Sequence, residues 1–242
     1  MLKAALITGA SRGIGKACAI ELARSFDTVI INSCSHKNDL EQVKNRIEAS
    51  GTSCQMYTGD IGDYSFVQSM VSQLKEQQIQ IELLINNAAV SYVGLLTDMS
   101  IQDWNSVIQT NLTSVFNCCS QIVPQMVSNK SGHIINISSM WGLSGASCEV
   151  AYSTTKGGIH AFTQALAKEL APSNIAVNAI ACGTIDTSMN ACFSKEDLKQ
   201  IEEDIPVGRM GTAEEVAKMV RHIYESPIYL TGEIIKFDGG YL

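Results

Sequence analysis

Two side chains in the second half of the sequence have the types and spacing needed for proton transfer. Tyr152 and Lys156 are four residues apart in a stretch, 150–171, whose pattern predicts a helix, so both project from one face. The pKa of a free phenol is about 10, too high for ready proton exchange at neutral pH. We expect the neighbouring ammonium to stabilise the phenolate and lower the pKa of Tyr152, which would make it a general acid or base. The same spacing also occurs in solvent-exposed helix pairs.

A glycine-rich turn near the N-terminus is the second chemical feature. Residues 8–15 join an apolar run to a helical pattern that begins at Lys16. Glycines permit close approach of the backbone to a pyrophosphate, whose charge is met by the helix N-terminus. The spacing of Gly9, Gly13 and Gly15 is one residue longer than in the common dinucleotide fingerprint. The strand–turn–helix context favours a dinucleotide site over a chance glycine turn.

The elements that must position these groups alternate along the chain. Apolar runs predict strands, and amphipathic stretches between them predict helices. Near-continuous apolar strands are typical of a parallel sheet covered on both faces. The pattern predicts an α/β fold: a single doubly wound Rossmann domain, residues 1–242, with a seven-stranded parallel sheet flanked by helices. The predicted strands are 3–8, 28–32, 53–58, 83–86, 133–138, 176–181 and 233–237, and the predicted helices include 38–50, 64–77, 101–129 and 150–171.

One long irregular region, residues 183–211, follows the sixth predicted strand. Its middle, residues 194–204, is helical in pattern and acidic. A long insertion at the carboxyl edge of such a sheet is where substrate lids lie, so we expect a lid at about 184–210. The alternative is an ordinary surface connection.

Composition and charge exclude several classes of protein. The net charge is -7 and no stretch concentrates Lys and Arg, which argues against a nucleic-acid or anionic-membrane surface. The chain shows no signal-peptide pattern, and no apolar run approaches the roughly 20 residues of a membrane span, so we expect a cytoplasmic protein. The eight cysteines and four histidines lack metal-ligand spacing, which predicts reduced, mostly buried thiols and no metal.

These motifs together resemble the short-chain dehydrogenase/reductase family, and the similarity continues through the whole chain. TGASRGIG at residues 8–15 is similar to the family's cofactor motif. NNAA at residues 86–89 resembles its NNAG element, with Ala89 in place of the last glycine. The family's catalytic positions are matched by Asn111, Ser139, Tyr152 and Lys156.

The resemblance implies a nicotinamide-dependent oxidoreductase and a role for each of these residues. Tyr152 would protonate a carbonyl oxygen as hydride arrives, and Ser139 would hydrogen-bond the same oxygen. Lys156 would also hold the nicotinamide ribose. Asn111 would anchor a water that links Lys156 to solvent as a proton relay.

The end of the second predicted strand indicates which nicotinamide cofactor is used. NAD-specific folds commonly place Asp or Glu there, whereas here no carboxylate occurs before Asp39. Arg12 lies inside the glycine turn, where it could bind a 2′-phosphate with help from His36 or Lys37. Similar family members with an arginine in this turn use NADPH. We therefore predict NADP(H), the alternative for Arg12 being a surface cap.

The resemblance implies further cofactor contacts. Asp60 and Ile61 resemble the pair that contacts the adenine, although Asp60 could simply flank a helix. Residues 183–187 resemble the segment along the nicotinamide, which usually begins Pro-Gly and here begins Cys182-Gly183. The predicted cofactor-binding residues are Gly9, Ser11, Arg12, Gly13, Ile14, Gly15, Asn32, Cys34, Ser35, Asp60, Ile61, Asn87, Ala88, Ala89, Tyr152, Lys156, Gly183, Ile185 and Thr187.

Two resemblances compete for the substrate, and the first covers the whole chain. The pattern, including IPVGR at 205–209 and FDGG at 237–240, looks most like bacterial 3-oxoacyl-[acyl carrier protein] reductases. It implies a 3-oxoacyl thioester on an acidic carrier, and a homotetramer with interfaces near 101–129 and 150–171. Two basic positions near the site mouth usually hold that carrier. Lys130 matches the first, and Ser173 replaces the second.

The second resemblance is local. SMWG at 139–142 and GASCEV at 145–150 look like a branch that reduces a 5-aminopentanone modification on elongation factor P. Glu149 could meet the amine of that substrate, or could cap the helix N-terminus instead. Trp141 could line the pocket or pack beneath the loop. The predicted substrate-binding residues are Ser139, Trp141, Glu149 and Tyr152.

A hypothesis of another class is a non-catalytic nicotinamide-binding sensor or scaffold. Such proteins generally lose the tyrosine or the lysine. All four catalytic positions are present in this sequence, which favours an enzyme.

Overall fold

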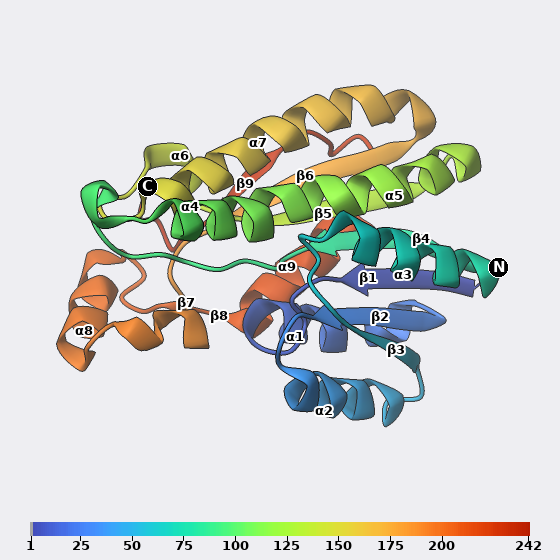
Figure 1. Ribbon diagram of the computed structural model, residues 1–242, viewed down its shortest axis with the longest axis horizontal. Helices are drawn as coiled ribbons and strands as arrows, with labels where there is room; N and C mark the ends of the chain where they lie inside the picture. The colour runs from blue at the N-terminus through green and yellow to red at the C-terminus, as the bar shows by residue number, and fades with distance from the viewer. Residues whose placement is uncertain (1) are drawn as a thin grey trace.

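A seven-stranded sheet forms the centre of the computed structural model, which describes residues 2–242 (Figure 1). The strand order is β3-β2-β1-β4-β5-β6-β9 and all six pairings are parallel. The chain starts in the middle of the sheet, winds to one edge and then to the other, which confirms the predicted doubly wound fold. The strands are β1 (Leu2–Ile7), β2 (Thr28–Ser33), β3 (Ser53–Thr58), β4 (Ile79–Asn86), β5 (Gly132–Ser139), β6 (Ile175–Cys182) and β9 (Ile234–Phe237).

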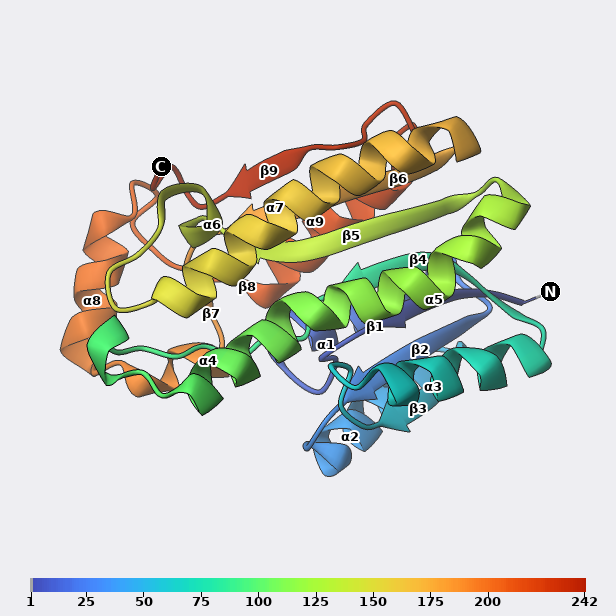
Figure 2. The ribbon, with the colours of Figure 1, turned by 45° about the horizontal axis from the view of Figure 1, so that its top comes forward.

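Helices cover both faces of this sheet (Figures 1 and 2). Successive strand residues point to opposite faces, so Ala5 and Ile7 enter one core while Ala4 and Leu6 enter the other. The first core is covered by α1 (Gly13–Leu22), α2 (Lys37–Glu48) and α9 (Ala213–Glu225). The second is covered by α3 (Tyr64–Glu76), α5 (Ser114–Asn129) and α7 (Val150–Leu170).

The structure differs from the predicted elements in several places, and β4 begins at Ile79, four residues earlier than predicted. The helix predicted over 101–129 is divided into α4 (Ile101–Ile108), a π-helical segment η3 (Gln109–Thr113) and α5. The first helix begins at Gly13, three residues earlier than predicted. A short helix, α6 (Trp141–Ser144), follows β5. A further helix that was not predicted is α9, whose start is marked by a capping box between Thr212 and Glu215.

The segment predicted as a lid contains its own small elements. β7 (Ile185–Asp186) and β8 (Gly211–Thr212) pair in parallel, apart from the main sheet. Between them lie η5 (Ser188–Cys192) and α8 (Lys195–Asp204), which begins with a capping box at Ser194. Within residues 2–242, no helix is both long and apolar enough to span a membrane.

Candidate active site

The four predicted catalytic residues are linked at the carboxyl edge of the sheet. Ser139 is the last residue of β5, and its side chain hydrogen-bonds that of Tyr152 on α7. The ammonium of Lys156 lies over the Tyr152 ring, 5.4 Å from the centroid, and Nζ donates to the carbonyl oxygen of Ile137 at 2.9 Å. Asn111 Nδ2 donates to Oγ1 of Thr155, the neighbour of Lys156, at 3.3 Å.

The pKa of Tyr152 moves opposite to the expected direction. Burial is the main cause of a pKa well above the ordinary value, and the charges of Glu149 and Cys182 add to it, while the Ser139 hydrogen bond opposes it. The prediction that Lys156 lowers this pKa is therefore wrong for the protein alone, because the phenol is only 9% exposed and desolvation disfavours the phenolate. Tyr152 is held protonated at neutral pH, the form that donates a proton.

The Lys156 side chain is buried, and its pKa lies only slightly above neutral pH. Its side chain is 3% exposed, and burial lowers its pKa to about 8, with the charge of Cys182 opposing the shift. Cys182 lies at the end of β6, directly across from Ser139 in the strand register. The thiol that replaces the family's proline therefore sits beneath the catalytic pair.

Asn111 is fixed by its side-chain amide. Oδ1 accepts from the Val90 N–H at 2.8 Å, and Nδ2 donates to the Val90 carbonyl at 2.9 Å. Together with the Thr155 contact, these bonds tie the loop after β4 to α7 at the π-helical segment. The expected water relay remains a prediction, and the amide itself is already engaged by protein groups.

The glycine turn is too close to its neighbours for side chains. Gly9 has φ +63°, and a Cβ there would lie 2.8 Å from Cα of Ala88. A Cβ at Gly15 would lie 2.4 Å from the Gly9 carbonyl oxygen. Asn87 Nδ2 donates to the carbonyls of Thr8 and Gly9, and Thr8 Oγ1 accepts from the Ala88 N–H. The loop after β4 thus holds the turn in shape from one side.

The open side of this turn fits the phosphates of a dinucleotide. α1 begins at Gly13, and the preceding Arg12 has an extended φ of -155° with no side-chain capping bond. The first N–H groups of the helix therefore point toward space that an anion could occupy. A Cβ at Gly13 would lie 3.3 Å from Cγ2 of Thr187, so the turn faces the segment predicted to follow the nicotinamide. Arg12 is exposed and its side chain makes no capping bond to the helix, so a cofactor contact and a surface role both remain predictions.

At the end of β2, some predicted cofactor residues are buried and hydrogen-bonded within the protein, and others are exposed. Asn32 is buried, and its amide donates to the carbonyls of Tyr57 and Gly59 in and after β3. Ser11 is also buried and accepts a hydrogen bond from Ser33 at 3.2 Å. Cys34 and Ser35 follow the strand and are exposed.

The pair predicted to contact the adenine lies after β3. Asp60 is exposed, and its Oδ1 accepts from the Gly62 N–H at 2.8 Å, while Ile61 is buried. The helix-capping role belongs to Asp63, whose side chain accepts from the Ser65 N–H at the start of α3. Asp60 is therefore not the cap of that helix.

Glu149 and Trp141 occupy different environments near Tyr152. Glu149 precedes α7 but makes no side-chain capping bond, so the capping hypothesis is wrong. Its Oε2 accepts from the Ser91 hydroxyl at 3.3 Å, burial raises its pKa, and its charge acts on Tyr152. The Trp141 ring packs edge-on against that of Tyr241 with 5.7 Å between centroids. Glu149 thus faces the site, and Trp141 contacts the C-terminal segment.

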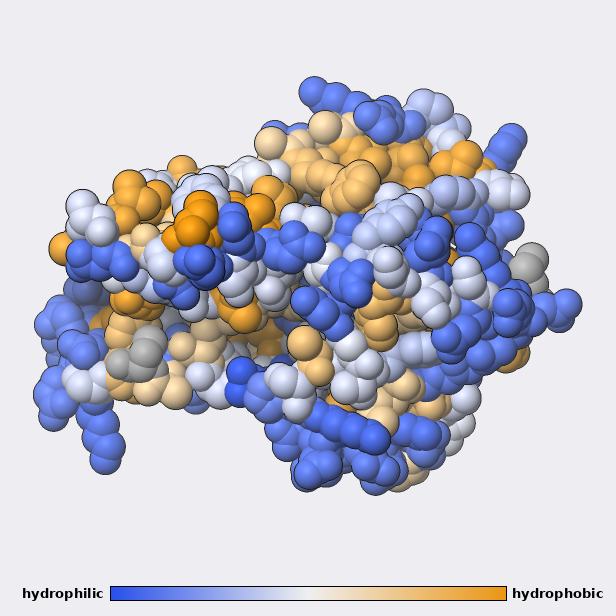
Figure 3. All heavy atoms as spheres, in the orientation of Figure 1, coloured by the Kyte–Doolittle hydropathy of each residue, from blue (hydrophilic) through white to orange (hydrophobic). Residues whose placement is uncertain are grey.

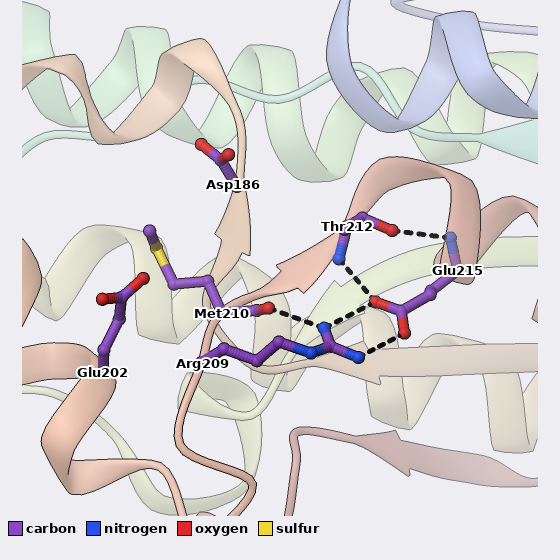
Figure 4. Close-up of a pocket in the computed structure, with 6 residues that line it drawn as sticks. All are labelled: Asp186, Glu202, Arg209, Met210, Thr212 and Glu215. Atoms are coloured by element: carbon purple, nitrogen blue, oxygen red, sulfur yellow. Dashed lines mark hydrogen bonds and ion pairs between the residues drawn. The ribbon is translucent and has the colours of Figure 1, made fainter.

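A cavity of about 420 Å³ lies at the base of the predicted lid (Figure 4). Both guanidinium NH groups of Arg209 donate to the Glu215 carboxylate, at 2.9 and 2.7 Å. Glu215 also accepts from the Thr212 N–H at 2.9 Å and so caps α9. The cavity is lined by Asp186, Glu202, Arg209, Met210, Thr212 and Glu215.

The two positions expected to hold a carrier protein, residues 130 and 173, lie far from the catalytic residues. Asn174 Nδ2 donates to the Lys130 carbonyl at 3.1 Å, so residues 130 and 173 are near one another. Both follow the C-terminal ends of helices that run antiparallel to the strands. They therefore lie at the amino edge of the sheet, opposite Tyr152 and Ser139 (Figure 2). The expectation that they flank the site mouth of the same chain is wrong.

Several supporting residues were missed from the sequence. Thr8 and Ser33 hold the glycine turn, and Ser138 and His160 contact each other beneath Ser139. His160 could have been found by its spacing, because it continues the four-residue period of Tyr152 and Lys156. Thr8, Ser33 and Ser138 are short polar residues at strand ends, and nothing in the sequence separates them from ordinary loop residues.

Comparisons with known proteins agree with this geometry. The profile of the short chain dehydrogenase family matches residues 3–198. The 3-oxoacyl-[acyl-carrier-protein] reductase FabG of Staphylococcus aureus is 37% identical over 241 residues, 99% of this chain and 98% of its own. The protein of the same name from Aquifex aeolicus is 38% identical over 98% of this chain and 96% of its own. The uncharacterized oxidoreductase YmfI of Bacillus subtilis is 34% identical over 100% of this chain and 99% of its own.

The solved structures point the same way. A dehydrogenase from Agrobacterium tumefaciens superposes with a TM-score of 0.92 at 30% identity, covering 99% of this chain and 95% of that one. Fold, glycine cradle and catalytic constellation define an oxidoreductase that uses a nicotinamide cofactor and acts on CH–OH or C=O groups. The chain belongs to the short-chain dehydrogenase family.

Proposed function

We propose that this chain is an NADPH-dependent reductase of 3-oxoacyl thioesters carried by acyl carrier protein, yielding the 3-hydroxyacyl thioester. The observation that carries the proposal is the meeting of Ser139, a protonated Tyr152 and Lys156 beside the glycine cradle. The full-length relatives named as such reductases support the substrate class.

In the proposed mechanism, the chain's residues hold the carbonyl and deliver one proton. Bound NADPH supplies the hydride. Ser139 donates a hydrogen bond to the substrate oxygen and fixes its position. Tyr152 transfers its proton to the same oxygen as negative charge develops there. The raised pKa of Tyr152 suits reduction, because oxidation would require the phenolate, which burial disfavours.

Lys156 and Asn111 would support this step from α7 and the π-helical segment. The Lys156 ammonium, whose pKa is about 8, would hold the nicotinamide ribose and favour charge on Tyr152 during transfer. Asn111 would hold the loop after β4 against α7 and so support the relay that returns a proton to Tyr152.

The end of the second strand and the glycine turn beside it favour NADPH over NADH. No carboxylate occurs at the end of β2, which stops at Ser33. The exposed Arg12 lies in the neighbouring turn, where its guanidinium could form charge-assisted hydrogen bonds with a 2′-phosphate. Cys34 and Ser35, which follow the strand, are also exposed. Cofactor choice would be measured as the ratio of kcat/KM for NADPH and NADH.

An apolar rim around the site supports an acyl substrate. Figure 3 shows hydrophobic residues gathered over α4 and the loop that precedes it. The Gly94 N–H donates to the Cys148 carbonyl at 2.8 Å, so this loop borders the start of α7. Apolar contact with such a rim would hold a hydrocarbon chain outside the polar catalytic centre. The exposed apolar residues of this loop, α4, α6 and the start of α7 are Val93, Leu95, Leu96, Ile101, Leu143 and Val150.

The test is NADPH oxidation by the purified protein with acetoacetyl-acyl carrier protein and with acetoacetyl-coenzyme A. Tyr152→Phe is expected to keep cofactor binding and lose at least about a thousandfold in kcat, because the proton donor is removed. Ser139→Ala is also expected to lower kcat, because it removes the hydrogen bond to the substrate oxygen. A fully active Tyr152→Phe protein would refute the mechanism.

A second candidate rests on Glu149. Its carboxylate lies beside Tyr152 and is held by Ser91, where it could pair with a substrate amine. This favours the 5-aminopentanone modification of elongation factor P as an alternative substrate. A small aminoketone would then be preferred over the thioester, and Glu149→Gln would remove that preference while leaving thioester turnover intact. The family and the complete set of catalytic residues leave the non-catalytic sensor without support.

The wider organisation is also part of the proposal. Residues 184–210 would act as the substrate lid of a single domain, closing over the site from β7 and β8. The chain would work in the cytoplasm as a homotetramer through its α4–α5 and α7 faces, where Phe116 is 54% exposed. Light scattering of the purified protein measures that assembly directly.

A further inference from the structure

The face of α7 that carries the catalytic pair also carries an imidazole that the proposed mechanism does not use. His160 follows Lys156 by one helical turn and Tyr152 by two, and its side chain is buried. Buried ring nitrogens require hydrogen-bond partners, because an unpaired buried polar group destabilises the fold. The identity of those partners shows what the ring holds in place.

Both partners belong to the segment that contains Ser139. Nε2 of His160 lies 2.8 Å from Oγ of Ser138, near the end of β5. The ring also hydrogen-bonds the backbone of Gly142 in α6. Ser138 and Gly142 bracket residues 139–141, and α6 lies against α7 (Figure 2). His160 therefore spans the strand end and the short helix that follows it.

Close packing makes this bridge rigid. A Cβ at Gly142 would lie 2.6 Å from Cε1 of His160 and 2.7 Å from the backbone carbon of Lys156. Within the bracketed segment, Ser139 Oγ accepts from the Trp141 N–H at 3.2 Å. A shift of the ring would therefore move α6, and with it the hydroxyl that contacts Tyr152.

We infer that His160 is a positioning residue: its neutral imidazole clamps residues 138–142 and thereby holds Ser139 where the substrate oxygen must lie. A neutral imidazole has one donor and one acceptor nitrogen. With the ring N–H donated to the Gly142 carbonyl, Nε2 accepts the hydroxyl proton of Ser138. The inference rests on the catalytic role proposed for Ser139.

Protonation of the ring would reverse one hydrogen bond of the clamp. Both nitrogens of an imidazolium are donors, so the Ser138 hydroxyl could no longer donate to Nε2. A second acceptor is within reach, because Ser138 Oγ also lies 3.3 Å from the Lys156 carbonyl oxygen. The hydroxyl would turn toward that carbonyl, and the hydrogen bond that links β5 to the ring would be reversed.

The surroundings keep the ring neutral at pH 7. Burial lowers the pKa of His160, the Gly142 backbone raises it, and the charge of Lys156 lowers it. Residues 141–144 have no ionisable side chain, and the other histidine of this sheet region, His133, is at the opposite end of β5. At the end of β6, Cys182 acts on Lys156. The ring therefore takes up a proton only below its ordinary pKa of about 6.5.

The test is the pH profile of kcat for NADPH oxidation with acetoacetyl-coenzyme A. For the wild type we expect an acid limb below about pH 6.5. His160→Phe keeps the ring shape but loses both hydrogen bonds, so kcat should fall about 10- to 100-fold, with unchanged KM for NADPH and no acid limb. Ser138→Ala removes the hydroxyl that donates to Nε2, so the limb should move to higher pH.

The outcomes separate this inference from the proposed function. Wild-type kcat and an unchanged acid limb in His160→Phe would overturn it, as would a lower kcat with the limb intact, because purely structural damage does not remove a titration. If His160→Phe does not fold, an unmoved limb in Ser138→Ala overturns it instead. Absence of NADPH oxidation by the wild type with either thioester would refute the proposed function, whereas wild-type activity beside an unaltered His160→Phe refutes only the role of His160.

Discussion

Replacing Lys156 by methionine should make the protein more stable while abolishing turnover. Burial lowers the pKa of Lys156 from 10.5 to about 8, and each pKa unit corresponds to about 1.4 kcal/mol, so burying the charged form costs about 3 kcal/mol. Methionine has a similar length and no charge. It also removes the hydrogen bond to the Ile137 carbonyl, a loss of about 1 kcal/mol. The net gain expected at pH 7 is about 2 kcal/mol.

The stability advantage of Lys156→Met should depend on pH, because the burial penalty applies only while Lys156 is charged. Below pH 8 the lysine is charged in both folded and unfolded chains, so the full penalty is present. Between pH 8 and 10.5 the folded chain has lost the proton while the unfolded chain keeps it, so wild-type stability rises. The advantage of Lys156→Met should therefore shrink to near zero by about pH 10.

Urea unfolding at pH 7 and pH 10, at one fixed protein concentration, measures both effects. Lys168→Met is the matched control, because Lys168 is exposed on the same helix and its replacement should leave the pH dependence unchanged. A methionine variant less stable than wild type at pH 7, or an advantage that persists at pH 10, would refute the reasoning from burial.

Three further predictions concern the cofactor and the pH profile. Arg12→Ala should raise the Kd for NADPH about 10- to 100-fold and leave that for NADH almost unchanged, because only the 2′-phosphate contact is removed; an equal loss for both cofactors would contradict the assignment. Gly15→Ala should abolish binding of both cofactors in fluorescence titration, because its Cβ would lie 2.4 Å from the Gly9 carbonyl oxygen, and wild-type affinity would show that the turn can relax. Reductase kcat/KM should fall as pH rises through about 8, where Lys156 loses its proton, and Lys156→Arg should move that limb upward. A limb that stays in place in Lys156→Arg would assign it to another group.

The fold was predictable because its signals are local and repeated. Most strands of the sheet are apolar runs bounded by turn residues, and the bounds of the more polar β3 still match the predicted 53–58. The break at residues 109–113 was not predictable, because it depends on the side chain of Asn111 pairing with the Val90 backbone 21 residues away. A periodic pattern carries no sign of such a distant contact.

The residues that meet at the site were predictable from the sequence, whereas their pKa values were not. Motif spacing brought Ser139, Tyr152 and Lys156 together correctly, since each is fixed by a strand end or a helical turn. The pKa of Tyr152 depends on how deeply the helix is buried and on the position of Glu149, and neither is encoded in the spacing. The same holds for the location of Lys130, which follows from the direction of a helix relative to the strands.

The attachment of residues 184–210 has a consequence for evolution and engineering. This segment enters and leaves through β7 and β8, two short strands that pair with each other rather than with the main sheet. The Arg209–Glu215 ion pair and the α9 cap secure its exit without using a residue of the catalytic centre. Because Thr187 lies next to the glycine turn, we expect an exchange of residues 188–210 alone, between the β7 and β8 anchor points, to change substrate preference while cofactor binding is kept.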